Sequence, residues 1–147
     1  MRISSFAFLA AVFLAIGMQT AKADDDYRVV TVLTSPEPQT QLMAMVLTMQ
    51  AVKGGAAGHI LLCGPAGDIA LKDAPASATA PQQPKGMSPK SLMQQIMTKT
   101  GTRVEVCAIY LPNKGVGPEA LIEGVTVARP PEMAARLMAD DTRVLSF

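Results

Sequence analysis

Aromatic side chains and histidine are scarce in this sequence of 147 residues. It contains no tryptophan, two tyrosines and four phenylalanines, and His59 is its single histidine. Proteins that bind single-stranded nucleic acid stack bases on aromatic side chains, and this chain offers little such surface. One histidine also makes a Ser-His-Asp hydrolase or a histidine-based zinc site hard to assemble. We therefore interpret His59 as an ordinary strand-edge residue without a catalytic or metal-binding role.

The first 23 residues follow the pattern of a secretory signal peptide. Arg2 gives a positive start, an apolar run extends from Phe6 to Met18, and Ala21-Lys22-Ala23 matches the small-x-small cleavage site. The apolar run is too short for a bilayer core, which needs about 20 residues. We expect cleavage after Ala23, a periplasmic or secreted location, and no membrane attachment afterwards.

The remaining chain, residues 24–147, has the length of one domain and no excess of charge. Loss of Arg2 and Lys22 leaves 11 basic side chains against 12 acidic ones. This balance gives no positive potential that would attract nucleic acid or an anionic membrane. Gly64-Pro65-Ala66-Gly67 lacks the lysine and hydroxyl residue of a P-loop and the glycine spacing of a dinucleotide site, so it predicts a turn. The methionines fall at helical spacing typical of a core and do not form a copper site. We expect neither cofactor nor metal.

Strand-like and helix-like segments alternate along the domain. Ser88, Pro89 and Gly101 are typical of a helix N-cap, first turn and C-cap. Met43 and Leu47 widen the apolar stripe of an earlier helix, which predicts that this helix is well covered. The expected strands are 27–33, 59–63, 103–109, 125–128 and 143–147, and the expected helices are 39–53, 89–100, 118–123 and 131–139.

This alternation predicts an α/β fold of three layers, with a five-stranded, mostly parallel sheet between helices. The flavodoxin-like strand order 2-1-3-4-5 is the arrangement we expect. Residues 73–85 are rich in Ala, Pro and Gln and predict a flexible loop. Such a loop is either a mobile surface segment or a flap over the carboxyl ends of the strands.

The two cysteines are the best candidates for chemistry. Cys107 lies near the carboxyl end of the third strand, where α/β folds bind ligands, and Lys114 would favour its thiolate form. Cys63 ends the second strand. In a 2-1-3 order the first strand separates them by roughly 9–10 Å, beyond the ~7 Å that a disulfide spans. We therefore do not expect a permanent bridge, although a transient bond, with Cys63 as resolving thiol, and a buried, inert Cys63 both stay open.

From Val29 to Phe147 the chain resembles the DsrE/DsrF-like family, which includes the TusD-type sulfur-relay subunits. The similarity rests on the first strand and helix, on Gly58-His59 before the glycine-containing segment 64–67, and on the ending 139–147. Its strongest part is Val104-Glu105-Val106-Cys107 followed by Lys114-Gly115. The resemblance implies that Cys107 carries sulfur as a persulfide and that Lys114 activates it. It also implies assembly as a trimer or hexamer and a protein that donates or accepts the sulfur.

Three features depart from that family pattern. The signal peptide implies export, whereas the relay subunits are cytoplasmic. No second cysteine follows within residues 108–114, and a proline-rich insertion precedes Ser88. The leading hypothesis is an exported sulfur-handling protein that uses Cys107 as carrier. The alternatives are a non-catalytic, oligomeric binding module with inert cysteines and a redox pair of Cys107 with Cys63.

Overall fold

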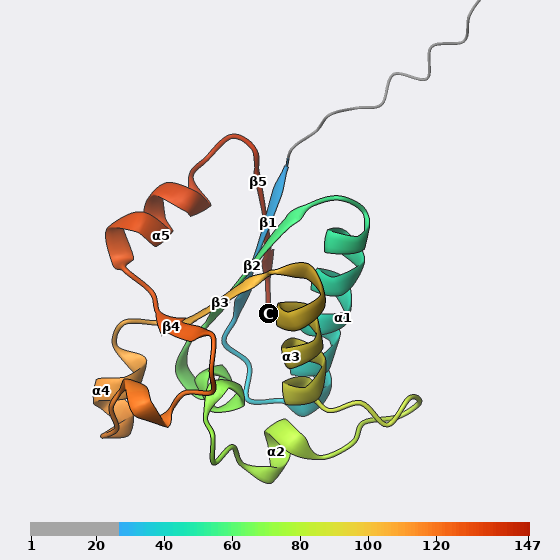
Figure 1. Cartoon of the computed structure of the whole chain (residues 1–147), viewed down its shortest axis with the longest axis vertical. Coiled ribbons are helices and arrows are strands. Elements are labelled where there is room, and N and C mark those ends of the chain that lie inside the picture. The colour runs from blue at the N-terminus through green and yellow to red at the C-terminus, as the bar shows by residue number, and fades with distance from the viewer. Residues whose placement is uncertain (1–26) are drawn as a thin grey trace, which may run out of the picture.

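A computed structural model describes residues 27–147 (Figure 1), so the predicted signal peptide lies outside the described residues. The chain forms one five-stranded sheet in which all neighbouring strands are parallel, with the order β4-β3-β2-β1-β5. Among residues 27–147 no helix is long and apolar enough to cross a membrane. The strands are β1 (Arg28–Leu33), β2 (Ala57–Leu62), β3 (Arg103–Val106), β4 (Val125–Val127) and β5 (Thr142–Ser146).

The parallel α/β sheet is confirmed, but the expected strand order 2-1-3-4-5 is wrong. The chain steps sideways from β1 through β2 and β3 to β4, and β5 then returns to pair with the free side of β1. The alternation of strands and helices requires a parallel sheet but does not fix the lateral order of the strands. Both β1 and β2 bury residues on both faces, so their sequences do not show which of them is central.

Two long helices cover one face of the sheet. Helix α1 (Pro38–Lys53) and helix α3 (Pro89–Thr100) pack over a core that includes Leu33, Ile60 and Val106. The predicted caps of α3 are confirmed: Ser88 Oγ accepts from the N–H of Ser91, and Gly101 ends the helix in the left-handed conformation that glycine adopts readily. Within this core a buried hydrogen bond of 2.6 Å joins Thr31 on β1 to Thr48 on α1.

The opposite face carries a single short helix. Helix α5 (Pro130–Leu137) leads from β4 back across the sheet to β5 (Figure 1). Its Met133 packs against Val30, Leu61 and Ala128, which form a second and smaller core. The prediction of helices on both faces is therefore confirmed, although the two layers differ greatly in extent.

The connections hold more structure than the sequence suggested. The predicted turn at 64–67 is a 3-10 helix, η1 (Gly64–Ala70), and the third strand ends at Val106 rather than 109. Helix α4 (Tyr110–Lys114) was not predicted, and η2 (Pro118–Ala120) replaces the expected helix 118–123.

The segment predicted as a loop at 73–85 contains a short helix, α2 (Ala76–Thr79), whose Ala78 is buried in the main core. A bridge between Gln82 and Met87 then forms a hairpin. The loop prediction is thus wrong for residues 76–79, because alanine supplies enough apolar contact to hold one helical turn. Its flexibility stays a prediction.

The extent of the main core leads to a stability test. Met93 on α3 is fully buried, whereas Met138 is 82% exposed. We expect Met93→Ala to lower the free energy of unfolding by about 2–5 kcal/mol, since it removes apolar contacts and leaves a cavity. Met138→Ala is the matched control and should change it by less than about 0.5 kcal/mol. Urea denaturation checks both values, and equal effects of the two variants would contradict this packing.

Candidate functional site

The two cysteines form a disulfide at the carboxyl edge of the sheet. Cys63 directly follows β2 and Cys107 directly follows β3, with 5.1 Å between their Cα atoms. The N–H of Cys107 donates to the carbonyl of Leu62 at 2.8 Å and extends the pairing of the two strands. The expected separation of roughly 9–10 Å is therefore wrong. It followed from the wrong strand order, which placed β1 between two strands that are in fact neighbours.

Both cysteines are partly buried and lie beside the core under α5. They pack with Val32 and Leu137 around the second core, and Cys107 also contacts the main core. The interpretation of Cys63 as a buried, unpaired residue is not supported, because it is bonded and only partly buried. Each of the two residues thus keeps part of its surface in contact with solvent.

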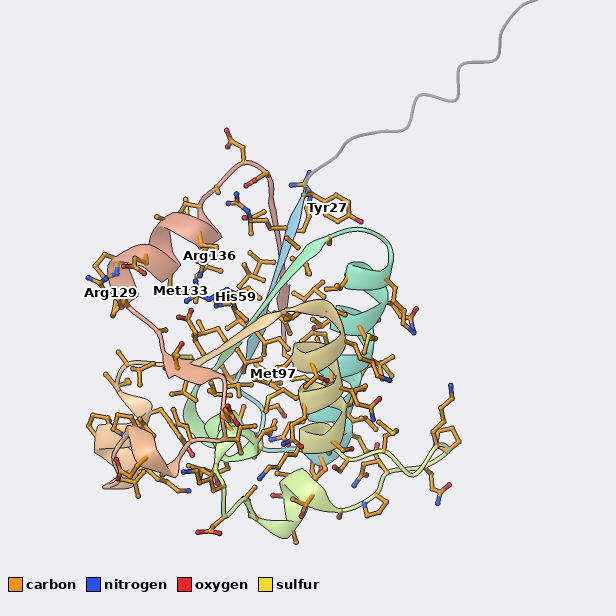
Figure 2. All side chains as sticks on the ribbon, viewed as in Figure 1. Tyr27, His59, Met97, Arg129, Met133 and Arg136 are labelled. Atoms are coloured by element: carbon orange, nitrogen blue, oxygen red, sulfur yellow. A yellow bond between two sulfur atoms is a disulfide. The ribbon has the colours of Figure 1, made fainter. Side chains whose placement is uncertain are left out.

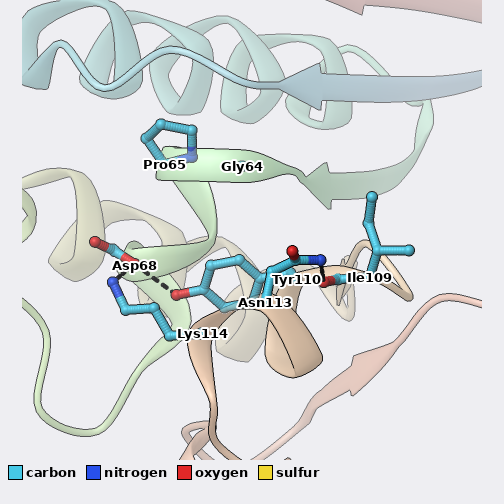
Figure 3. A pocket seen from close by; sticks show the side chains of 7 residues that line it. All are labelled: Gly64, Pro65, Asp68, Ile109, Tyr110, Asn113 and Lys114. Atoms are coloured by element: carbon cyan, nitrogen blue, oxygen red, sulfur yellow. Dashed lines mark hydrogen bonds and ion pairs between the residues drawn. The ribbon is translucent and has the colours of Figure 1, made fainter.

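A cleft of about 480 Å³ is lined by residues that closely follow the two cysteines in the chain (Figure 3). Its walls are the two segments that follow the cysteines: Gly64 and Pro65 on one side, and residues 109–114 on the other. Ile109 stands on this cleft and is 72% exposed, which is unusual for a large aliphatic side chain. The cleft therefore has an apolar rim and lies next to the cysteine pair in the chain, at the edge of the sheet where α/β folds place their sites.

Asp68 holds the floor of this cleft together. Its Oδ1 accepts a hydrogen bond of 2.6 Å from the hydroxyl of Tyr110 and pairs with Lys114 Nζ at 2.7 Å (Figure 3). Burial raises the pKa of Tyr110, and the hydrogen bond and the charge of Asp68 raise it further. Tyr110 therefore stays protonated at neutral pH and remains a donor.

The structure places Lys114 in the cleft lined by the segments that follow the cysteines, but its ammonium group is engaged by Asp68. Lys114 can favour the thiolate of Cys107 only if its positive charge still acts on Cys107 while it is paired with Asp68. This activating role stays a prediction. Asp68 was missed in the sequence. Its only signal was its place directly after Gly67, in a glycine-containing segment that follows a strand.

Gly67 is required for this arrangement. A Cβ atom at Gly67 would collide with the ring of Tyr110, so only glycine allows η1 and α4 to approach this closely. The sequence Gly64 to Gly67, interpreted as a simple turn, thus has a packing role that sets the width of the cleft.

A buried polar cluster lies between the sheet and α5. His59 Nε2 is 2.7 Å from Glu105 Oε2, and Arg136 Nη1 lies 3.6 Å from the same oxygen. Figure 2 shows Arg136 and Met133 reaching from α5 toward His59 on β2. His59 and Glu105 are both more than nine-tenths buried, so each charge must be compensated within the cluster.

His59 does not begin its strand as we expected, since β2 starts at Ala57 and His59 is buried within it. It lies on β2, the middle strand of the sheet, which pairs with both β1 and β3. Burial lowers the pKa of His59, and the positive charge of Arg136 lowers it further, while Glu105 opposes the change. A neutral imidazole with its proton on Nε2 donates to Glu105, whose remaining charge Arg136 balances.

The lowered pKa of His59 makes a pH-dependent stability prediction. Below the unfolded-state pKa of about 6.5, the unfolded chain binds a proton that the folded chain resists. The free energy of unfolding should therefore fall as the pH drops below about 6.5, by at most about 1.4 kcal/mol for each pH unit from this residue. Urea denaturation between pH 7.5 and 5 measures the slope.

His59→Gln is the matched variant, since its amide still donates to Glu105 but does not titrate. It should lose part of the slope while remaining folded at pH 7.5. An unchanged slope would show that other groups cause the acid dependence and that His59 is not held neutral.

Comparison with known proteins supports the fold. No protein-family model matches the chain, and no curated protein matches it by sequence. The solved structure of the MTH1491 protein of unknown function from Methanobacterium thermoautotrophicum is similar, with a TM-score of 0.61 and 13% identity. The match covers 83% of this chain and 100% of that one.

The crystal structure of the ychN protein from E. coli is similar as well. Its TM-score is 0.59 at 21% identity, and the match covers 82% of this chain and 99% of that one. At these identities the likeness is one of fold and does not extend to activity. The chain therefore has a YchN-like α/β fold, as the resemblance to the DsrE/DsrF-like family implies.

Proposed function

We propose that this chain is an exported sulfur-handling protein whose site is the Cys63–Cys107 pair. The observation that carries the proposal is the disulfide itself: two partly buried cysteines follow neighbouring parallel strands and stand beside an open cleft. The sequence resemblance to the DsrE/DsrF-like family supports sulfur transfer as the chemistry, and the YchN-like fold agrees with that resemblance. The signal peptide pattern supports a periplasmic location, in which such a pair can be oxidised.

Sulfur transfer starts from the reduced pair. A partner dithiol reduces the Cys63–Cys107 disulfide and itself becomes a disulfide. The thiolate of Cys107 then attacks the outer sulfur of a donor persulfide. A bond forms between Cys107 Sγ and that sulfur, the sulfur–sulfur bond of the donor breaks, and the donor leaves as a thiolate.

The stored sulfur has two exits. An acceptor thiolate attacks the outer sulfur and leaves Cys107 as a thiolate. Alternatively, the Cys63 thiolate attacks Cys107 Sγ, expels hydrosulfide and restores the disulfide. Because the cysteines are neighbours, the second exit is intramolecular and needs no further reagent. Cys107 is thus the carrier, Cys63 the resolving thiol, and the protein a carrier rather than a hydrolase.

The cleft gives the donor or acceptor a place to bind. Ile109 and Pro65 offer apolar contact, and the Tyr110 hydroxyl and Lys114 ammonium offer hydrogen bonds. We also propose a homo-oligomer, a trimer or hexamer, as the family resemblance implies. The exposed Val144 on β5 and Met138 after α5 are apolar positions that such contacts would cover.

The central test is the mass of the mature protein after sulfur loading. The protein is reduced, freed of reductant, treated with sodium polysulfide and analysed by intact mass spectrometry. We expect a gain of one sulfur atom that a reductant removes. Cys107→Ser should abolish that gain, because Ser lacks the attacking thiolate. Equal gains in Cys107→Ser and the parent would contradict a carrier role for Cys107.

Cys63→Ser tests the resolving thiol separately. Without the neighbouring thiolate, the persulfide on Cys107 should persist at least about ten times longer than in the parent, because hydrosulfide release becomes intermolecular. The time course of the mass gain and of released sulfide measures this. An unchanged lifetime would mean that Cys63 does not resolve Cys107.

The competing hypothesis is an oligomeric binding module with a structural disulfide. The bond links residues 44 positions apart, and a chain-entropy model gives such a crosslink a stabilisation of about 4 kcal/mol. A structural bond should therefore resist mild dithiol reductants, and its removal should unfold much of the protein. Rapid reduction with an unchanged far-UV circular dichroism spectrum favours the sulfur-handling function instead.

A further inference from the structure

A groove of about 900 Å³ follows the seam between α1 and α3, on the face of the sheet opposite α5. The hairpin at 82–87 closes one end of it, and Lys53 and Thr100 stand near the other. Apolar side chains of both helices and the hairpin form its floor. They are Leu42, Met43, Val46, Met49, Met87 and Leu92.

The expectation that α1 is well covered is wrong along this groove. Met43, which lines the groove, is 51% exposed, and Leu47, one turn later on the same helix but outside the groove lining, is 42% exposed. Several of the floor residues are methionines, whose flexible side chains adapt to varied partners. An apolar strip that a domain does not cover itself is typical of a binding surface.

The charge around the groove has one sign. Lys53, Lys85 and Lys99 line it, and no Asp or Glu does. Neither α1 nor α3 contains an acidic residue at all. Because both helices run opposite to parallel strands, Lys53 and Lys99 stand together near one end, while Lys85 stands in the hairpin at the other. The groove thus has cationic groups at both ends of an apolar floor.

We propose that this groove binds an amphipathic helix of a partner protein that carries acidic residues at both ends of its apolar stripe. From Leu42 to Lys53 the groove follows 11 residue steps of α1, or about 16 Å, which matches about three turns of a bound helix. Apolar anchors at i, i+3 or i+4, and i+7 fill such a groove. Five glutamines along its border, including Gln50 and Gln95, supply the polar rim of an interface.

Cations at both ends favour a helix over a fatty acid, which has a carboxylate at one end only. The surface lies away from the cysteine cleft and shares no lining residue with it. The inference therefore goes beyond the proposed function and does not rest on it.

The experiment uses a fluorescent synthetic helix of about 14 residues with a leucine stripe and glutamates at both ends, titrated into the mature protein. We expect saturable binding at one site that weakens as salt is added. The double variant Lys53→Glu, Lys99→Glu should weaken binding at least about tenfold. Arg129→Glu, Arg143→Glu is the control with the same charge change outside the groove, and it should bind as the parent does.

Met43→Ser tests the apolar floor at an exposed position where folding is not at risk, and it should also weaken binding.

The proposal is overturned if a peptide with lysine in place of glutamate binds equally well, or if no peptide binds at 1 mM. It is also overturned if dodecanoate binds in the groove and the acidic peptide does not displace it. Sedimentation velocity provides a last criterion, since self-association that Met43→Glu abolishes would assign the groove to a second copy. Cys63→Ser and Cys107→Ser should retain peptide binding, so failure of the sulfur function leaves this result unaffected.

Discussion

Leu62 and Val106 end two neighbouring parallel strands at the same level of the sheet. This register brings together the two segments that follow, and with them Cys63, Cys107 and both walls of the cleft. The hydrogen bond from the Cys107 N–H to Leu62 belongs to the backbone ladder and does not need the sulfur–sulfur bond. The strands therefore hold the two cysteines close whether or not they are bonded.

The two faces of the sheet are stabilised by different interactions. The face under α1 and α3 is buried mainly by large aliphatic and methionine side chains, with the Thr31–Thr48 hydrogen bond as a polar contact between sheet and helix. The face under α5 has a much smaller core and relies on the His59–Glu105–Arg136 cluster to fix its one helix. Breaking such a buried cluster is costly, because each remaining charge would lose its partner. Leu137 of α5 and both cysteines pack against this same small core.

The fold was predictable from local patterns because apolar runs, caps and turns act over a few residues. Ser88 and Gly101 bound α3 as expected, and the five strands fall close to their expected places. The lateral order of the strands was not predictable, because it depends on contacts between segments far apart in the chain. Because the expected order placed β1 between β2 and β3, the expected distance between Cys63 and Cys107 was too long for a disulfide.

The candidate site was predictable only in part, for a similar reason. Cys107, Lys114 and Cys63 were identified by their chemistry and by their places at strand ends, and Cys107 and Cys63 do meet. Asp68 and Glu105 had no comparable signal, because an acidic residue after a turn or within a strand is usually solvated. Their importance arises from Tyr110, Lys114, His59 and Arg136, which reach them from other elements of the fold.

A cysteine pair that cycles between states must keep its geometry when the bond opens. Here the β2–β3 ladder supplies that geometry, and Asp68 holds the cleft through Tyr110 and Lys114 without any contribution from sulfur. A thiolate at Cys63 would thus remain beside a persulfide on Cys107, where attack is intramolecular. A disulfide at this position would still stabilise the fold, because it restricts the unfolded chain rather than the native geometry. The backbone arrangement therefore lets the bond open without loss of the geometry that a reversible pair requires.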